Sequence, residues 1–121
     1  MKPQDKDRVK KMLLFVNDVI ILSKDITLDR LVNDKSFQYS LLYPLGQIGE
    51  IAIKLTESAQ SDGKRIEEIY PEIEWADWRG FRNRLFHDYG TIDFNIVLEM
   101  IDEAIPLLEQ GLTVVLGEQT S

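Results

Sequence analysis

The sequence contains no cysteine and only one histidine among its 121 residues. Without cysteine there can be no disulfide bond, thiolate metal ligand or cysteine nucleophile, and one imidazole cannot form a histidine cluster within one chain. We therefore expect neither a metal site nor another cofactor.

Long hydrophobic runs are also missing. No apolar stretch approaches the roughly 20 residues that a membrane span needs, and the first residues lack the apolar centre of a signal peptide. We expect a soluble, cytoplasmic protein without a membrane partner. Because 44% of the residues are apolar, the chain can bury one core, and we predict a single domain over residues 1–121.

Basic side chains are scarce, with 14 Lys and Arg against 21 Asp and Glu, for a formal net charge of −7. This balance opposes general nucleic-acid binding, so contact with a polyanion must be confined to a local basic patch. The candidate patch is the segment RGFRNRLFHDYG, which holds Arg79, Arg82, Arg84 and His87.

No alternating run rich in Val, Ile and Thr indicates a strand, whereas helical periodicity extends along almost the whole chain. We predict an all-α fold with a loop at Gln60 to Gly63. The expected helices run from about Lys6 to Ser23, from the capping residue Thr27 to Asp34, from Ser36 to about Leu55, from about Glu74 to His87, and from the capping residue Asp93 to about Leu116, with a turn or short helix between Lys64 and Tyr70.

Four residues within these helices have local consequences. Gly46 and Gly49 would let another helix approach closely. Pro44 predicts a kink near residues 41–45, and Pro106 predicts a bend, because proline removes a helical hydrogen bond and clashes with the preceding turn.

The first helix carries two apolar stripes, and the second consists of Phe15, Val19 and Leu22. One core does not require both stripes, so the second stripe suggests a partner chain and hence a dimer.

Arg82 lies in the apolar stripe of the fourth long helix, four residues after Trp78 and three before Leu85. An unpartnered buried guanidinium costs several kcal/mol. Arg82 must therefore meet a ligand, a set of carbonyl groups or an acid, for which Glu50 and Glu72 are the candidates.

Asn83 and His87 lie four residues apart on a neighbouring stripe, and His87 is roughly 140° around the helix from Arg82. Three arrangements could still bring Arg82 and His87 together. The arginine could reach around, the helix could loosen before Gly90, or two copies of the chain could share one cleft.

Each feature also has a purely structural interpretation. A lone histidine near a helix C-terminus often interacts only with the helix dipole, and an arginine in an apolar stripe is often one half of an ion pair. Trp75, Trp78 and Phe81 are better interpreted as core or interface residues than as a platform for base stacking. The combination of features favours a functional site.

Residues 82–89 match the pattern R-N-x-x-x-H-x-Y, and here the sequence resembles the HEPN proteins, specifically the HepT-like toxins. The resemblance extends over most of the chain. It includes DRVKKMLLFVNDVI, IGEIAIKL, YPEIEWADWRGFRNRLFHDYG and the segment from Ile105 to Leu108.

This resemblance implies a HEPN-type up-and-down bundle of four to five helices that forms a homodimer and acts as a metal-independent RNA endonuclease. Its composite R-x4-H site would lie in the dimer cleft. There His87 would act as general acid or base, Arg82 would bind the scissile phosphate, and Asn83 would orient the phosphate or the histidine. Two further residues, Arg79 and Arg84, would help to bind RNA.

The resemblance further implies a type VII toxin–antitoxin system, in which a minimal nucleotidyltransferase neutralises the toxin by transferring AMP to Tyr89. A charged adenylyl group two residues from His87 would block the groove. The structural alternative for Tyr89 is a half-buried aromatic residue with its hydroxyl in water. The alternative function is a non-catalytic HEPN module that binds a nucleotidyltransferase and presents substrate or nucleotide to it.

Overall fold

The computed structural model describes residues 1–60 and 62–120. Ser61, which belongs to the predicted loop, lies outside the described residues. Across the described part of the chain, the backbone is helical apart from loops and one isolated bridge between Ala59 and Arg65. The predicted all-α fold is therefore confirmed. The elements are α1 (Pro3–Leu22), α2 (Leu28–Asn33), α3 (Lys35–Glu57), α4 (Ile66–Ile69), α5 (Trp75–His87), the 3-10 helix η1 (Tyr89–Thr91), α6 (Phe94–Glu99), the π-helical turn η2 (Met100–Ala104) and α7 (Ile105–Thr120).

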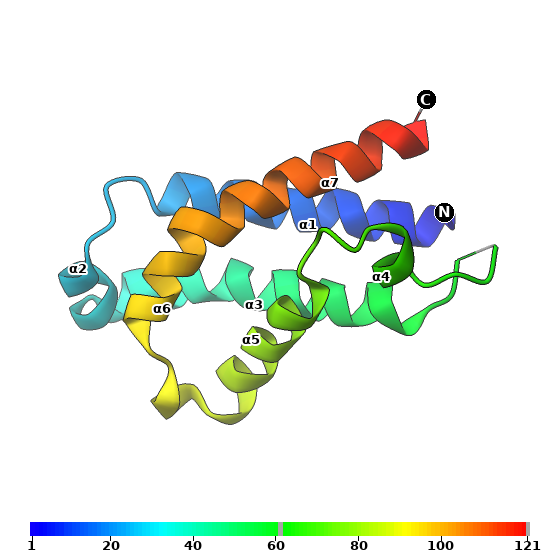
Figure 1. Cartoon of the computed structure of the whole chain (residues 1–121). Helices are drawn as coiled ribbons and strands as arrows, with labels where there is room; N and C mark the ends of the chain where they lie inside the picture. Colours follow the sequence, from blue (N-terminus) through cyan, green and yellow to red (C-terminus); the bar gives the residue numbers. More distant parts are fainter. Residues whose placement is uncertain (61, 121) are drawn as a thin grey trace.

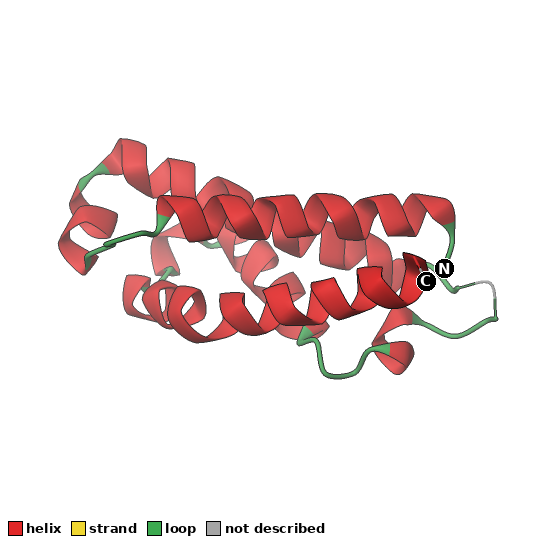
Figure 2. Ribbon diagram, turned by 90° about the horizontal axis from the view of Figure 1, so that it is seen from above, coloured by secondary structure: helices red, strands yellow, loops and turns green. Residues whose placement is uncertain are grey.

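The long helices form one bundle in which α3 is the central element (Figures 1 and 2). On one side α3 packs against α1, which also packs against α7, and on another side α3 packs against α5. The chain ends meet at one end of the bundle, where the Lys6 side chain donates to the backbone carbonyl of Gln119. Within the described residues, no helix combines the length and the hydropathy needed to cross a membrane.

Side-chain caps start three of the helices. The Thr27 hydroxyl accepts from the N–H of Arg30, and the Asp93 carboxylate accepts from the N–H of Asn95, as the sequence predicts. Asp34, rather than Ser36, caps α3 by accepting from the N–H of Phe37. The helix then continues without a break through Pro44.

The predicted bend at Pro106 takes the form of a π-helical turn. Pro106 has no N–H and its ring crowds the carbonyl one turn earlier, so an ordinary α-turn is unfavourable at this point. The preceding turn, η2, widens instead, and the N–H of Ile105 bonds to the carbonyl of Met100. Figure 1 shows the chain changing direction between α6 and α7.

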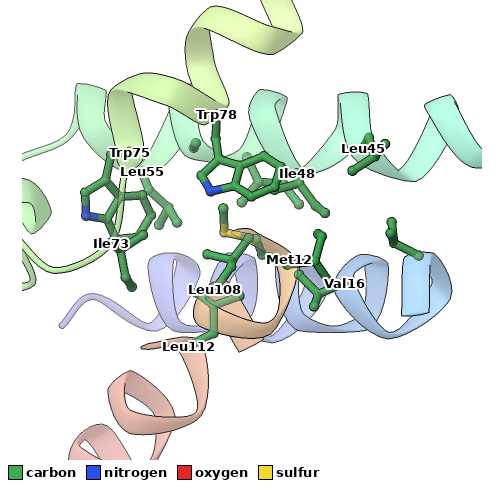
Figure 3. Close-up of a cluster of buried hydrophobic side chains, with 14 of the residues drawn as sticks. Met12, Val16, Leu45, Ile48, Leu55, Ile73, Trp75, Trp78, Leu108 and Leu112 are labelled. Carbon is green, nitrogen blue, oxygen red and sulfur yellow. The ribbon is translucent and has the colours of Figure 1, made fainter. Parts of the chain in front are cut away.

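The core lies between α1, α3, α5 and α7, and Figure 3 shows its central side chains. Trp75 and Trp78 are each only 3% exposed, which confirms their interpretation as core residues. Two tryptophans near the start of α5 bury a large apolar surface against the other helices. This contact fixes the N-terminal half of α5 on the bundle.

The second apolar stripe of α1 is largely occupied inside the chain. Val19 is fully buried, Leu22 is partly buried, and the ring of Phe15 packs edge-on against Tyr43 with centroids 6.1 Å apart. The stripe therefore does not require a partner chain, because α1 lies between α3 and α7 and needs an apolar side for each, and the dimer stays a prediction.

Candidate functional site

The position of α5 on α3 depends on the absence of side chains at Gly46 and Gly49. A Cβ atom on Gly49 would lie 2.4 Å from the Cβ of Arg82 and 2.5 Å from the carbonyl oxygen of Trp78. A Cβ atom on Gly46 would lie 2.8 Å from Cδ2 of Leu85. The predicted close approach of another helix is therefore confirmed, and it brings Arg82 directly onto α3.

Arg82 meets an acid on α3 at this crossing. Its Nε donates to Oε2 of Glu50 at 2.6 Å, and the two side chains are 24% and 29% exposed. Of the two acids that the sequence offered, Glu50 is thus the partner and Glu72 is not. A short, charge-assisted hydrogen bond in a partly desolvated position fixes the guanidinium more firmly than a surface ion pair would.

Two further contacts orient the guanidinium of Arg82. Its Nη1 donates to Oδ1 of Asn83 at 3.1 Å, and its Cζ lies 4.5 Å from the centroid of the Phe86 ring, in the range of a cation–π contact. Within the described part of the chain, its Nη2 has no hydrogen-bond partner. The arginine is therefore anchored through one edge, while donors of its fork remain available to an anion.

The structure joins Arg82 to Asn83 but does not join either residue to His87. The chain is α-helical from Arg82 through His87 and leaves the α-helix at Asp88, before Gly90, but this change comes after both residues and does not bring them together. The Arg82 side chain extends toward Glu50 and Phe86. His87 is exposed, and its ring forms no hydrogen bond or ion pair with any described residue.

The other two arginines of the basic segment lie apart from Arg82. Arg79 pairs with Glu67 at 3.2 Å. Arg84 lies about 200° around α5 from Arg82 and lines a mostly apolar groove of about 760 Å³ between α5 and the α6–α7 segment. The lining of this groove includes Trp78 and Leu107 but neither Arg82 nor His87.

Tyr89 begins η1, directly after the end of α5. Its hydroxyl donates to Oε1 of Gln38 at 2.6 Å, and its ring centroid lies 6.4 Å from that of Tyr39. Burial, and to a smaller extent the nearby phenol of Tyr39, raises the pKa of Tyr89 above its ordinary value of 10.0. The hydroxyl is therefore held by a buried amide, not by water as the structural interpretation of the sequence proposed.

This arrangement places an anchored arginine beside an amide on α5 and leaves an exposed imidazole, without a partner among the described residues, at the end of the same helix. Sequence reasoning offered Glu50 only as one of two acids, and it missed Gln38 and the contact of Arg82 with Phe86. The position of Phe86 four residues after Arg82 was an available signal for their contact. Gln38 gave no such signal, because its partner is 51 residues away. The described residues include no group of three or more His, Cys, Asp or Glu side chains that could hold a metal ion.

Comparison with known proteins gives one family and several relatives. A family model described as Ribonuclease HepT-like matches residues 7–115. The protein named "Putative RNase MJ1380" from Methanocaldococcus jannaschii is 28% identical over 99 residues, which are 82% of this chain and 84% of that protein. "Probable ribonuclease HepT" from Thermococcus cleftensis is 26% identical over 109 residues, 90% of this chain and 93% of that protein. No solved structure matches the chain.

Proposed function

The chain belongs to the HepT-like ribonuclease family, and from this premise we propose that it is a metal-independent RNA endonuclease. The relatives named as ribonucleases support RNA as the substrate class. The observation that carries the proposal is the guanidinium of Arg82, which is fixed by Glu50 at 2.6 Å while its Nη2 has no partner among the described residues.

In this proposal the RNA phosphate binds to the free donors of Arg82. A planar, permanently charged fork stabilises the negative charge that develops on the phosphate oxygens in the transition state. Asn83 already accepts from Arg82, so its amide N–H groups are left to orient the phosphate. His87 transfers a proton between the 2′-hydroxyl and the leaving oxygen, for which an exposed imidazole is suited near neutral pH.

The direct test is cleavage of RNA by the purified protein in the presence of EDTA. Arg82→Ala and His87→Ala should each lower the cleavage rate by at least about 100-fold. Arg30→Ala is a matched control, because Arg30 also pairs with an acid, Asp34 at 3.8 Å, and also lies over a phenylalanine ring. Equal rates for all three variants and the wild type would remove the catalytic assignment, and loss of activity in EDTA would remove metal independence.

We further propose that the active site forms in a homodimer and takes Arg82 and His87 from different chains. Within one chain these two side chains do not meet. The face that carries Arg82 also exposes apolar side chains that a second copy would cover, including Tyr43 at 62% and Phe86 at 56%.

Complementation tests the shared site. When Arg82→Ala and His87→Ala chains are mixed and reassociated, half of the dimers are mixed, and each mixed dimer holds one intact site of two. About a quarter of the wild-type activity should return, as follows from two-fold symmetry. If the mixture stays inactive although mixed dimers form, the site does not combine residues from two chains.

The proposal extends to regulation. We place the protein in the cytoplasm as the toxin of a type VII toxin–antitoxin pair, which a minimal nucleotidyltransferase neutralises by transferring AMP to Tyr89. Tyr89 is the second residue after His87, so an adenylyl phosphate there would repel RNA next to the catalytic imidazole. Arg79 and Arg84 would contribute to RNA binding. Intact mass after co-expression with the neighbouring nucleotidyltransferase should increase by one or more AMP units in the wild type and not in Tyr89→Phe.

A second candidate function is a non-catalytic module that binds a nucleotidyltransferase. It is favoured because the two proposed catalytic side chains do not meet within one chain. Arg82 is already paired with Glu50, and His87 has no partner among the described residues. A stable complex with the transferase, together with no RNA cleavage and no growth arrest by the free protein, would select this function over the nuclease.

A further inference from the structure

Gln38 connects three elements next to the end of α5, although nothing in its sequence context marks it as functional. It is fully buried on α3. Its Nε2 donates to the carbonyl of Leu31 at 2.9 Å and to that of Val32 at 3.4 Å. Both carbonyls belong to the last turn of α2, where backbone acceptors lack helical partners. Its Oε1 accepts from the Tyr89 hydroxyl at 2.6 Å.

This network fixes the direction of the hydrogen bond. Because Nε2 of Gln38 faces two carbonyl oxygens, a flipped amide would place three acceptors together, so Oε1 must face Tyr89. An amide oxygen carries no proton, and the Tyr89 hydroxyl is therefore the donor. Its raised pKa, caused mainly by burial, agrees with a phenol that keeps its proton.

From these contacts we infer that Gln38 is a positioning residue that holds Tyr89 against the α2–α3 junction, and that Tyr89 must leave this position to be adenylylated and cannot return afterwards. The inference rests on the proposed function for its modification step. It goes beyond that function because the transfer of AMP would then change the conformation around Tyr89, in addition to placing a negative charge beside His87.

The chemistry of the transfer explains why the contact cannot survive it. The phenolic oxygen of Tyr89 forms a bond to the α-phosphorus of ATP, the bond from that phosphorus to pyrophosphate breaks, and the hydroxyl proton passes to solvent. The resulting ester oxygen has no proton to donate. It would face the amide oxygen of Gln38 as a second acceptor at the 2.6 Å of the original contact, in a junction where Gln38 and Leu31 are both fully buried. The hydrogen bond is therefore lost on adenylylation, and Tyr89, which is 38% exposed, turns outward from Gln38.

Movement of Tyr89 affects the backbone beside His87. The segment after α5 is held by short-range bonds, from the N–H of Thr91 to the carbonyl of Asp88 at 2.9 Å and from the N–H of Ile92 to the carbonyl of Tyr89 at 3.1 Å. The Gln38 contact is the long-range side-chain hydrogen bond that ties this segment to the bundle. When it is lost, η1 keeps its short-range bonds and the contact of Ile92 with the core, and the segment after His87 opens more often.

Hydrogen exchange tests the positioning role without any transferase. Loss of one hydrogen bond of ordinary strength should make the backbone amides of Thr91 and Ile92 exchange about 5-fold faster in Gln38→Met. Tyr89→Phe removes the same hydrogen bond by deleting its donor, the Tyr89 hydroxyl, and provides a second variant should Gln38→Met fold poorly. Gln47→Met is the matched control, because Gln47 lies on the same helix and its side chain makes no hydrogen bond with the described residues. Unchanged exchange in Tyr89→Phe, or in a folded Gln38→Met, would overturn the inference.

Modification kinetics supply the second arm. With purified nucleotidyltransferase and ATP, Gln38→Met should accept AMP about 5-fold faster than both the wild type and Gln47→Met. The reason is that the Tyr89 hydroxyl is no longer held by a hydrogen bond to residue 38 and is available to the transferase for a larger fraction of the time. An equal or slower rate in folded Gln38→Met overturns the inference and leaves the proposed function intact. If the wild type accepts no AMP at all, the proposed modification fails, while the exchange experiment still decides the positioning role.

Discussion

Substitution of Gly49 by alanine tests whether the close contact between α3 and α5 supports the site. In Gly49→Ala the new Cβ would lie 2.4 Å from the Cβ of Arg82 and 2.5 Å from the carbonyl oxygen of Trp78. Carbon atoms in contact are normally about 3.5–4.0 Å apart. Neither obstacle is the end of a flexible side chain, so α5 itself must move outward by about 1 Å.

The magnitude follows from two opposing contributions. Overpacking of this kind costs about 1–3 kcal/mol, and the rigid obstacles place Gly49→Ala at the upper end. Alanine also favours the helix over glycine by about 1 kcal/mol. We expect a net destabilisation of about 2 kcal/mol, which for a domain of this size lowers Tm by roughly 6–10 °C.

Two other glycines provide graded controls in the same pair of helices. Gly80→Ala in α5 should stabilise by about 0.5–1 kcal/mol, because helix propensity improves and a Cβ there meets nothing within 4 Å. Gly46→Ala should fall between the two, since its Cβ would meet only the terminal Cδ2 of Leu85, at 2.8 Å. The assays are urea unfolding and RNA cleavage. Cleavage should decrease in Gly49→Ala, because an outward shift of α5 separates Arg82 from Glu50.

The order of stability of the three variants tests whether the close contact between α3 and α5 positions Arg82. If Gly49→Ala is as stable as Gly80→Ala, the two helices do not rely on this contact, and the account of how Arg82 is positioned is wrong.

Three further predictions concern individual side chains. Glu50→Gln should remain folded, because a partly exposed ion pair contributes only about 0–1 kcal/mol to stability. Its single-turnover cleavage of RNA should nevertheless slow by about tenfold or more, because Arg82 loses its charged anchor. An unchanged cleavage rate would contradict the anchoring role of Glu50. Asp5 is fully buried and accepts three side-chain hydrogen bonds, so Asp5→Ala should lower the free energy of unfolding by about 3 kcal/mol, against a change within about 0.5 kcal/mol for the exposed Asp7→Ala. Above pH 10.0, folded Tyr89 keeps a proton that the unfolded chain loses, so stability should fall as the pH rises through the raised pKa. Denaturant titrations at several pH values should show a shallower decline in Tyr89→Phe than in the wild type, and identical declines would refute the raised pKa of Tyr89.

Much of the helical framework was predictable because its signals are local. Periodic apolar residues, the caps Thr27 and Asp93, and the prolines act over three or four residues, which is the range of a helical turn. The same locality explains an error at one boundary. Asp34 and Ser36 are both good capping residues, and the sequence does not say which of them bonds to the free N–H groups.

The errors and omissions arise where two distant segments meet. The second stripe of α1 suggested a partner chain because the number of neighbours of a helix is a property of the whole fold. Asp5 gave no sign of burial, since its partners Ser58 and Gln60 are more than 50 residues away. Gln38 was overlooked for the same reason.

The sequence by itself determined an all-α chain, the helix that carries Arg82, Asn83 and His87, and the need of Arg82 for a partner. These follow from the period of the helix and from the desolvation of a charge, and both can be read from neighbouring residues. Only the tertiary structure decided that Glu50 is that partner and that Gln38 holds the Tyr89 hydroxyl. Both contacts depend on how closely one helix approaches another, which is set by packing across the whole bundle.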